Sequence, residues 1–173
     1  MINVDTLTAE VNLPIYKLKY HFPNILNLVN DYRKNNPTSV NNNSHLSSWR
    51  SDWQTHKKDS RFNILIDFTI QALESFHLEL FHSKKKFGCS EMWIAQYDKG
   101  DHAERHYHYP LDWSAVYYIN VEDNTSPIIF GEDIRVQPEN NMMLLFPGWL
   151  NHRVPKTQGK RTLIAMNFDK TWT

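Results

Sequence analysis

From about residue 90 onward, the sequence becomes a succession of short runs rich in β-branched and aromatic residues. No other feature constrains the fold as strongly. The predicted strands are Met92–Tyr97, Ser114–Val121, Pro127–Phe130, Met142–Phe146 and Arg161–Phe168. Turn-forming Asp, Asn, Pro and Gly residues separate these runs. Many short strands at this spacing predict a sandwich or barrel and exclude a parallel α/β sheet.

The N-terminal half has a different pattern, which predicts one strand and supporting helices. Leu13–Tyr20 alternates between apolar and polar residues and predicts an opening strand. Pro23 is tolerated in the first turn of a helix, and the apolar spacing after it predicts a helix that ends near residues 35–37. We therefore expect residues 1–88 to support a β core formed by residues 89–173.

A second, longer helix is predicted from about residue 60 to about His82. Asp59 or Ser60 can cap its first turn. One face carries apolar residues at helical spacing and is expected to back the sheet. These residues are Phe62, Leu65, Ile66, Leu73, Phe76 and Leu80.

The stretch from Thr38 to Ser60 is rich in Asn, Ser and charged residues and is predicted to be a loop. It carries two tryptophans, Trp49 and Trp53. Because large aromatic side chains are rarely left in water, anchoring onto the core is the favoured interpretation. A place on a substrate rim is the alternative for both residues.

Composition narrows the class of protein. The chain has 173 residues, which suits a single domain spanning 1–173, with 19 Lys+Arg and 19 Asp+Glu. Such a neutral balance does not favour a general nucleic-acid or membrane binder. The one cysteine, Cys89, cannot form an intrachain disulfide or a thiolate zinc site alone. With no signal-peptide or membrane-spanning pattern, we expect a cytoplasmic protein.

Three of the nine histidines have the spacing of a metal site. His106 and His108 would share one face of a strand, and imidazole is the commonest metal-binding side chain. His152 follows 46 residues after His106, and the intervening strands can return it to the same barrel mouth. The alternative is a set of hydrogen-bonded histidines at strand ends. The other six are expected at the surface: His21, His45, His56, His77, His82 and His102.

Arg161 begins the last predicted strand. A guanidinium directed into a barrel is costly to bury without a partner, and no acidic residue lies near it in sequence. A carboxylate-bearing ligand would satisfy it through a bidentate pair. Tyr97 is a second inward candidate whose hydroxyl can contact the same carboxylate. Taken alone, a solvent-facing arginine at a strand end remains the alternative.

In this order the residues resemble the 2-oxoglutarate- and Fe(II)-dependent oxygenases, and most closely a small prolyl-hydroxylase-like group of bacteria and phages. The resemblance covers residues 92–168. The matching elements are Tyr97-x-x-Gly100, His106-x-His108, Trp113–Tyr118, Phe146–Pro155 and Gly159–Arg161. It implies a double-stranded β-helix, a jelly-roll barrel like that of the cupins, with helices packed on one side.

The resemblance also implies roles for individual residues. His106 and His152 correspond to the first and the distal iron ligands, Arg161 to the 2-oxoglutarate anchor, and Tyr97 to a second contact with the same carboxylate. The family commonly has Asp or Glu two residues after the first histidine, where this chain has His108. We expect His108 to be the third ligand, because residues two apart share a strand face. Asp112 is the alternative.

The implied activity is hydroxylation of an organic substrate, such as a prolyl residue of a protein or peptide, with 2-oxoglutarate as the small-molecule cosubstrate. Fe(II) and O2 take part, and succinate and CO2 are released. The protein's part in such chemistry is to orient the reactants in a dry pocket. Trp93, Tyr118 and Trp149 are candidates to line it, although core packing explains each equally well.

Two other classes remain open from the sequence. The segment from Gly100 to Asp112 resembles the first cupin motif with Asp in place of Glu, which would make the chain a metalloenzyme without 2-oxoglutarate. A cupin has no general need of Arg161, so this residue discriminates between the two. The second alternative is a jelly-roll binding module with no enzymatic activity, because one fold hosts many functions.

Overall fold

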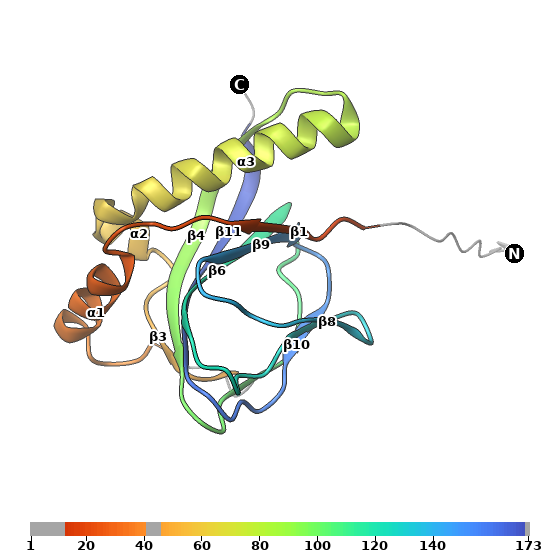
Figure 1. Ribbon diagram of the computed structural model, residues 1–173. Helices are drawn as coiled ribbons and strands as arrows, with labels where there is room; N and C mark the ends of the chain where they lie inside the picture. Colours follow the sequence, from red (N-terminus) through yellow and green to blue (C-terminus); the bar gives the residue numbers. More distant parts are fainter. Residues whose placement is uncertain (1–12, 41–45, 172–173) are drawn as a thin grey trace, which may run out of the picture.

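The computed structural model describes residues 13–40 and 46–171. The fold is mainly β, with two antiparallel sheets and a group of helices on one side (Figure 1). Within these residues no helix is long and apolar enough to cross a membrane. His45, one of the histidines expected at the surface, lies outside the described residues.

The larger sheet has six strands and the smaller has five, and every strand pairing is antiparallel. In spatial order the six-stranded sheet contains β1 (Tyr16–Lys19), β9 (Met142–Pro147), β6 (Trp113–Val121), β11 (Arg161–Thr171), β4 (Lys86–Tyr97) and β3 (Trp49–Arg50). The five-stranded sheet contains β2 (Leu46–Ser47), β5 (His102–His106), β10 (His152–Val154), β7 (Ile128–Phe130) and β8 (Ile134–Val136).

The helices cover the outer face of the six-stranded sheet. They are α1 (Ile25–Asn35), α2 (Thr55–Lys58), the short 3-10 helix η1 (Ser60–Phe62) and α3 (Asn63–Phe81). Figure 1 shows α3 crossing that sheet, with α1 and α2 near its N-terminal end. The five-stranded sheet faces the opposite side of the larger sheet, as expected for a jelly roll.

Two hydrophobic cores lie on the two faces of the six-stranded sheet. Along β11, Ile164 and Met166 join the helices in one core, whereas Leu163 and Ala165 join the second core between the sheets. Because both faces are buried, the central strands are apolar at nearly every position instead of alternating. The second core is the one that leads to the histidines.

The long helix has its predicted position, but its buried face differs from the predicted one at the C-terminal end. His77 is 6% exposed and lies one turn after Leu73, whereas Leu80 is 43% exposed. The Nδ1 of His77 donates to the Ser83 carbonyl at 2.8 Å, so the buried ring is satisfied. The expectation that His77 lies at the surface is therefore wrong, and Leu80 does not belong to the core face.

Several short strands were not predicted from the sequence. β5, β8 and β10 have three to five residues each, and none of them is among the five strands predicted after residue 90. The stretch from Thr38 to Ser60 contains β2, β3 and α2, so it is not a plain loop. Strands this short are defined by the partners they pair with, and local propensity carries little information about them.

Candidate metal centre and its pocket

Three histidine rings converge where β5 and β10 meet. His106 ends β5 and His152 begins β10, and the two residues are direct partners across the strand pair. His108 lies two residues beyond the end of β5. One ligand atom from each ring lies within 4.8 Å of the others. No other group of three or more potential metal ligands occurs in the described part of the chain.

The backbone sets the tautomer of two of these rings. His106 Nδ1 donates to the Glu104 carbonyl at 2.7 Å, and His152 Nδ1 donates to the Leu150 carbonyl at 2.9 Å. A carbonyl only accepts hydrogen bonds, so each Nδ1 carries the proton and each Nε2 has the lone pair. A second hydrogen bond of this kind is the usual way in which a metal-binding histidine is oriented.

His108 is held by different groups. Its backbone N–H donates to the Gly148 carbonyl at 2.6 Å. A side chain at Gly148 would place its Cβ 2.1 Å from the Leu111 carbonyl oxygen, so only glycine permits this close approach. The ring's Nδ1 lies 3.4 Å from the side-chain nitrogen of Asn167.

The Asn167 side chain is fully buried and fixed by two further partners. Its nitrogen donates to the Glu91 carboxylate at 2.8 Å, and its oxygen accepts from the Ser114 hydroxyl at 2.8 Å. A polar network therefore contacts the His108 ring, whereas backbone carbonyls accept hydrogen bonds from the other two rings. Asn167 and Glu91 were missed in the sequence, because they lie on strands where they read as ordinary polar positions.

The environment keeps two of the rings, those of His108 and His152, neutral. Burial, helped by the neighbouring His106 ring, lowers the pKa of His108 to about 3. Burial also lowers the pKa of His152 well below its usual value, and the His106 and His108 rings act in the same direction. Neutral imidazole is the form that binds metal ions, so the cluster fits a transition metal such as Fe(II).

Arg161 is the largest fully buried side chain near this cluster. It is 2% exposed, and Nη1 donates to the Ser126 carbonyl at 2.9 Å. Its Nε and Nη2 are buried with no hydrogen-bond partner among the described residues. Its Cζ lies 4.3 Å from the centre of the Tyr97 ring, so the tyrosine contributes a ring face to the arginine.

Arg50, on β3, is a second buried arginine that sequence reasoning missed. It is 3% exposed, and its Nε and Nη1 lack partners among the described residues. Its Cζ lies 3.7 Å from the centre of the Trp53 ring. The only signal in the sequence is an arginine three residues before a tryptophan, within a stretch that otherwise reads as a polar loop.

One pocket brings the histidines and both arginines together. Its walls are apolar residues of both sheets, and the two predicted aromatic residues Trp93 and Tyr118 belong to them. The lining residues that bear on the chemistry are Arg50, Tyr97, His106, His108, His152 and Arg161. Burial, helped by the neighbouring Tyr97 and opposed by Arg161, raises the pKa of Tyr118 to about 12. Its phenol is therefore a neutral hydrogen-bond donor.

The two tryptophans of the 38–60 stretch pack against the cores. Trp49 donates its indole N–H to the Pro37 carbonyl at 3.0 Å and packs against the helical core. Trp53 packs edge-to-face on Trp93, with 4.5 Å between ring centroids, and touches the inner core. Neither lines the pocket itself, but Trp53 supports both Arg50 and Trp93.

Two other candidates lie away from the pocket. The Asp112 carboxylate accepts from the backbone N–H and the Nζ of Lys170, both at 2.9 Å, and is not part of the histidine cluster. Trp149 is 49% exposed and lines a separate surface hollow. The strand that carries His106 ends before it could place Asp112 on the same face, which explains the first difference.

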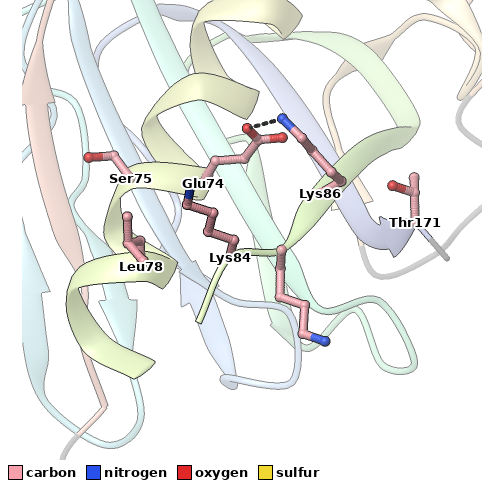
Figure 2. Close-up of a pocket in the computed structure, with 7 residues that line it drawn as sticks. Glu74, Ser75, Leu78, Lys84, Lys86 and Thr171 are labelled. Carbon is pink, nitrogen blue, oxygen red and sulfur yellow. Dashed lines mark hydrogen bonds and ion pairs between the residues drawn. The ribbon is translucent and has the colours of Figure 1, made fainter. Parts of the chain in front are cut away.

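A different hollow on the surface has none of this chemistry. It lies between α3 and the start of β4, and Figure 2 shows Glu74 and Lys86 joined across it at 2.8 Å. The lysines that follow α3, Lys84 to Lys86, are exposed there. This is a partly exposed ion pair between the middle of α3 and the first residue of β4, and the hollow contains no cluster of metal ligands among the described residues.

Comparisons with known proteins identify solved structures with a similar fold. No family model matches the sequence, and no curated protein matches it. Solved structures do match. A Trichoplax adhaerens prolyl hydroxylase, in complex with a fragment of the oxygen degradation domain of hypoxia inducible factor, has 16% identity and a TM-score of 0.68. The match covers 90% of this chain and 83% of that one.

Two further matches cover nearly all of both chains. A Pseudomonas putida prolyl-4-hydroxylase has 15% identity and a TM-score of 0.66 over 91% of this chain and 93% of its own. The viral collagen prolyl hydroxylase of Paramecium Bursaria Chlorella virus-1, in its 2-oxoglutarate complex, has 16% identity and a TM-score of 0.62 over 89% and 94%. The chain therefore has the double-stranded β-helix fold of these prolyl hydroxylases, with a three-histidine cluster inside it.

Proposed function

We propose that this protein is an Fe(II)- and 2-oxoglutarate-dependent dioxygenase that hydroxylates an organic substrate. The observation that carries the proposal is one pocket lined both by three histidines and by a buried, partly unpaired Arg161. A cation site and a carboxylate site within one pocket are what a metal and a keto diacid require together. A cupin-type metal enzyme without 2-oxoglutarate would leave the buried arginine unexplained.

His106, His108 and His152 would hold the iron through ring nitrogens. Bound Fe(II) supplies, with O2 and 2-oxoglutarate, the oxidising power that converts the keto acid to succinate and CO2 and hydroxylates a C–H bond. The protein's residues bind and orient the reactants. Arg161 would receive the carboxylate that does not reach the metal, using the donors at Nε and Nη2 that have no partner in the protein.

The residues around Arg161 add to this carboxylate site. The Tyr97 ring supports the guanidinium, and Tyr118 offers a phenol that stays protonated at neutral pH. Leu163, Ala165 and Val116 complete an apolar wall that excludes water. Low local polarity strengthens the pairing of a carboxylate with the arginine.

A prolyl residue of a peptide or protein is the substrate class suggested by the names of the three structural neighbours described above, which are prolyl hydroxylases. The identities of 15–16% leave the substrate to be found by experiment. A screen of proline-containing peptides and of free proline is the natural starting point.

The test is an anaerobic titration of purified protein with Fe(II) and then with 2-oxoglutarate, followed by the visible charge-transfer band of the chelate. We expect a saturable band that disappears in His152→Ala and Arg161→Ala. The exposed His21 and Arg135 provide matched controls, and His21→Ala and Arg135→Ala should keep the band.

The alternatives predict different results. Iron binding with no response to 2-oxoglutarate would favour a cupin-type enzyme. Absence of stoichiometric iron binding would favour a jelly-roll binding module and would contradict the proposed function.

A further inference from the structure

We propose that Arg50 binds a carboxylate of the primary substrate, so that the enzyme acts on a carboxylic acid or on a residue next to one. This inference deepens the proposed function and rests on it. The substrate class is therefore narrower than proline-containing molecules in general. The evidence is the unpaired state of Arg50, its place in the pocket, and its distance from Arg161.

Arg50 is a buried cation without a counter-ion. Only 3% of the residue is exposed, and no ion pair joins it to a carboxylate among the described residues. Arginine stays charged in proteins and carries five donors in a rigid fork. Leaving Nε and Nη1 buried and unpaired costs stability, so a ligand that supplies a hydrogen-bond acceptor to this guanidinium is favoured.

The acidic residues nearest to Arg50 are already engaged elsewhere. Glu91 accepts from the Asn167 side chain at 2.8 Å. Asp52 accepts from the Gln54 backbone N–H at 2.7 Å and lies 3.3 Å from the Lys58 ammonium. Both carboxylates favour the charged form of Arg50 against the effect of burial, but neither is hydrogen-bonded to it.

The guanidinium is held in one orientation by an aromatic stack. Its Cζ lies 3.7 Å from the centre of the Trp53 ring. Trp53 packs edge-to-face against Trp93, and the Trp93 ring lies 5.8 Å from the His108 ring. A stacked guanidinium presents its donor edge to a planar carboxylate, so Arg50 is prepared for bidentate binding on the Trp93 side of the metal site.

Arg50 and Arg161 occupy separate positions around the pocket. Arg50 is the partner of Ala95 on β4, while Arg161 on β11 is the partner of Tyr97, and β4 lies between β3 and β11. Standard strand geometry puts the two backbones about 12 Å apart. The two arginines therefore reach the same pocket from separate positions on the sheet.

The cosubstrate accounts for only one of these sites. Of the two carboxylates of 2-oxoglutarate, one belongs with the keto group at the metal and the other with Arg161. No carboxylate of the cosubstrate remains for Arg50. The second arginine thus selects an acid group on the other reactant.

Two sources supply the same chemistry. A free acid such as L-proline carries its own carboxylate, and a peptide carries one on an acidic side chain next to the reacting residue. The test uses paired probes on the anaerobic Fe(II)–2-oxoglutarate complex. These are L-proline against L-prolinamide, and acetyl-Pro-Glu-amide against acetyl-Pro-Gln-amide.

We expect at least one acid to perturb the visible band with an affinity about tenfold above that of its amide partner, because hydrogen bonds to charged groups are worth about that much. Arg50→Met should remove this preference while leaving the dissociation constant of 2-oxoglutarate within about twofold. Arg50→Lys should restore only part of it, since lysine lacks the planar fork. Equal binding of acids and amides, or a tenfold loss of 2-oxoglutarate affinity in Arg50→Met, would overturn the proposal.

A second measurement does not depend on iron. In metal-free protein carrying Arg161→Met, acetate at fixed ionic strength should raise the melting temperature relative to chloride. Adding Arg50→Met should abolish this shift, whereas adding Arg135→Met should not. If acetate has no effect, Arg50 is not a carboxylate site. If acetate acts but iron does not bind, the proposed function fails while the anion site stands.

Discussion

The pocket contains a histidine end, formed by His106, His108 and His152, and an arginine end, formed by Arg50 and Arg161. The two differ in how many of their polar atoms have a hydrogen-bond partner within the protein. At the histidine end, His106, His108 and His152 each have an ordering partner within the chain. At the arginine end, Arg50 and Arg161 each keep two buried N–H donors without a partner among the described residues. The same pocket thus contains one polar cluster with hydrogen-bond partners in the protein and one whose donors lack them.

This difference indicates what each end binds. In His106 and His152 the Nδ1 proton is already donated to a backbone carbonyl, so each Nε2 offers a lone pair, which suits a cation. A buried guanidinium with open donors costs on the order of 1–3 kcal/mol for each unsatisfied group, and only an acceptor that enters from outside offsets this cost. One end is therefore prepared for a metal and the other for anions.

Removing one histidine ring is the strongest test of whether this cluster binds a metal. We expect His106→Ala and His152→Ala to lower Fe(II) affinity by more than the roughly 10–100-fold that follows loss of an ordering partner, because each removes a ligand itself. His108→Ala should cost less than either, since its Nδ1 faces an amide nitrogen at 3.4 Å. Anaerobic calorimetry with Fe(II) measures all three.

A reversed order, with His108→Ala the most damaging, would show that the carbonyl-bound tautomers are not what selects the metal ligands. The exposed His21 provides the matched control, because His21→Ala removes an imidazole far from the cluster.

Replacing Arg161 by methionine separates binding from stability at the other end. We expect Arg161→Met to weaken 2-oxoglutarate binding about 100-fold, the equivalent of one to two charge-assisted hydrogen bonds. Fe(II) affinity should change by no more than about threefold. The melting temperature of the ligand-free protein should stay the same or rise, because an apolar residue of similar length replaces a partly unpaired buried charge.

The outcome that contradicts this prediction is a large fall in the melting temperature of ligand-free Arg161→Met. Arg161 would then act mainly through its hydrogen bond to the Ser126 carbonyl, and the open donors would have no functional meaning.

The sequence predicted the histidine end better than the arginine end, and the reason is physical. His106, His108 and His152 were identified because their residue type is rare and their spacing fits one barrel mouth. Their convergence depends on long-range strand pairing between β5 and β10, and the family resemblance supplied that topology. Asp112 was kept as an alternative because the end of β5 at His106 is not visible in the local pattern.

Arg50 could not be identified by the same reasoning. Its burial comes from a two-residue strand on the edge of the sheet, and from a tryptophan three residues away that folds back over it. Local composition around Arg50 is polar, so the sequence reads as a loop. The same limit applies to His77, whose burial follows from the angle of α3 on the sheet and not from its own polarity.

The Asn167 network tests whether His108 needs its support. We expect Asn167→Ala to lower Fe(II) affinity about tenfold, in the range found when an ordering partner of a metal ligand is lost. Ser114→Ala is the control, because it removes a partner of Asn167 while leaving the contact with His108. If both variants bind Fe(II) as the unmodified protein does, His108 is oriented by its backbone bond to Gly148 alone.

The smallest expected effect concerns Tyr118, which borders the arginine end. Burial raises the pKa of its phenol to about 12, so the group stays protonated and donates to a carboxylate at neutral pH. Tyr118→Phe should weaken 2-oxoglutarate binding several-fold, the value of about one neutral hydrogen bond. Because the folded pKa lies above the ordinary value of 10, its contribution to stability is complete below pH 10 and is lost as the pH rises toward 12.

The direction of this pKa shift can be measured by spectrophotometric titration of tyrosinate in the ligand-free protein. Fewer tyrosines should ionise below pH 11 than in the unfolded chain, because the pKa values of Tyr16 and Tyr117 are also raised by burial, and Tyr118→Phe should reduce that difference by one tyrosine. Tyr107→Phe is the matched control, since Tyr107 is 57% exposed and outside the pocket. An ordinary titration of Tyr118 near pH 10 would mean that water reaches the arginine end freely, and the contrast between the two ends would lose its electrostatic basis.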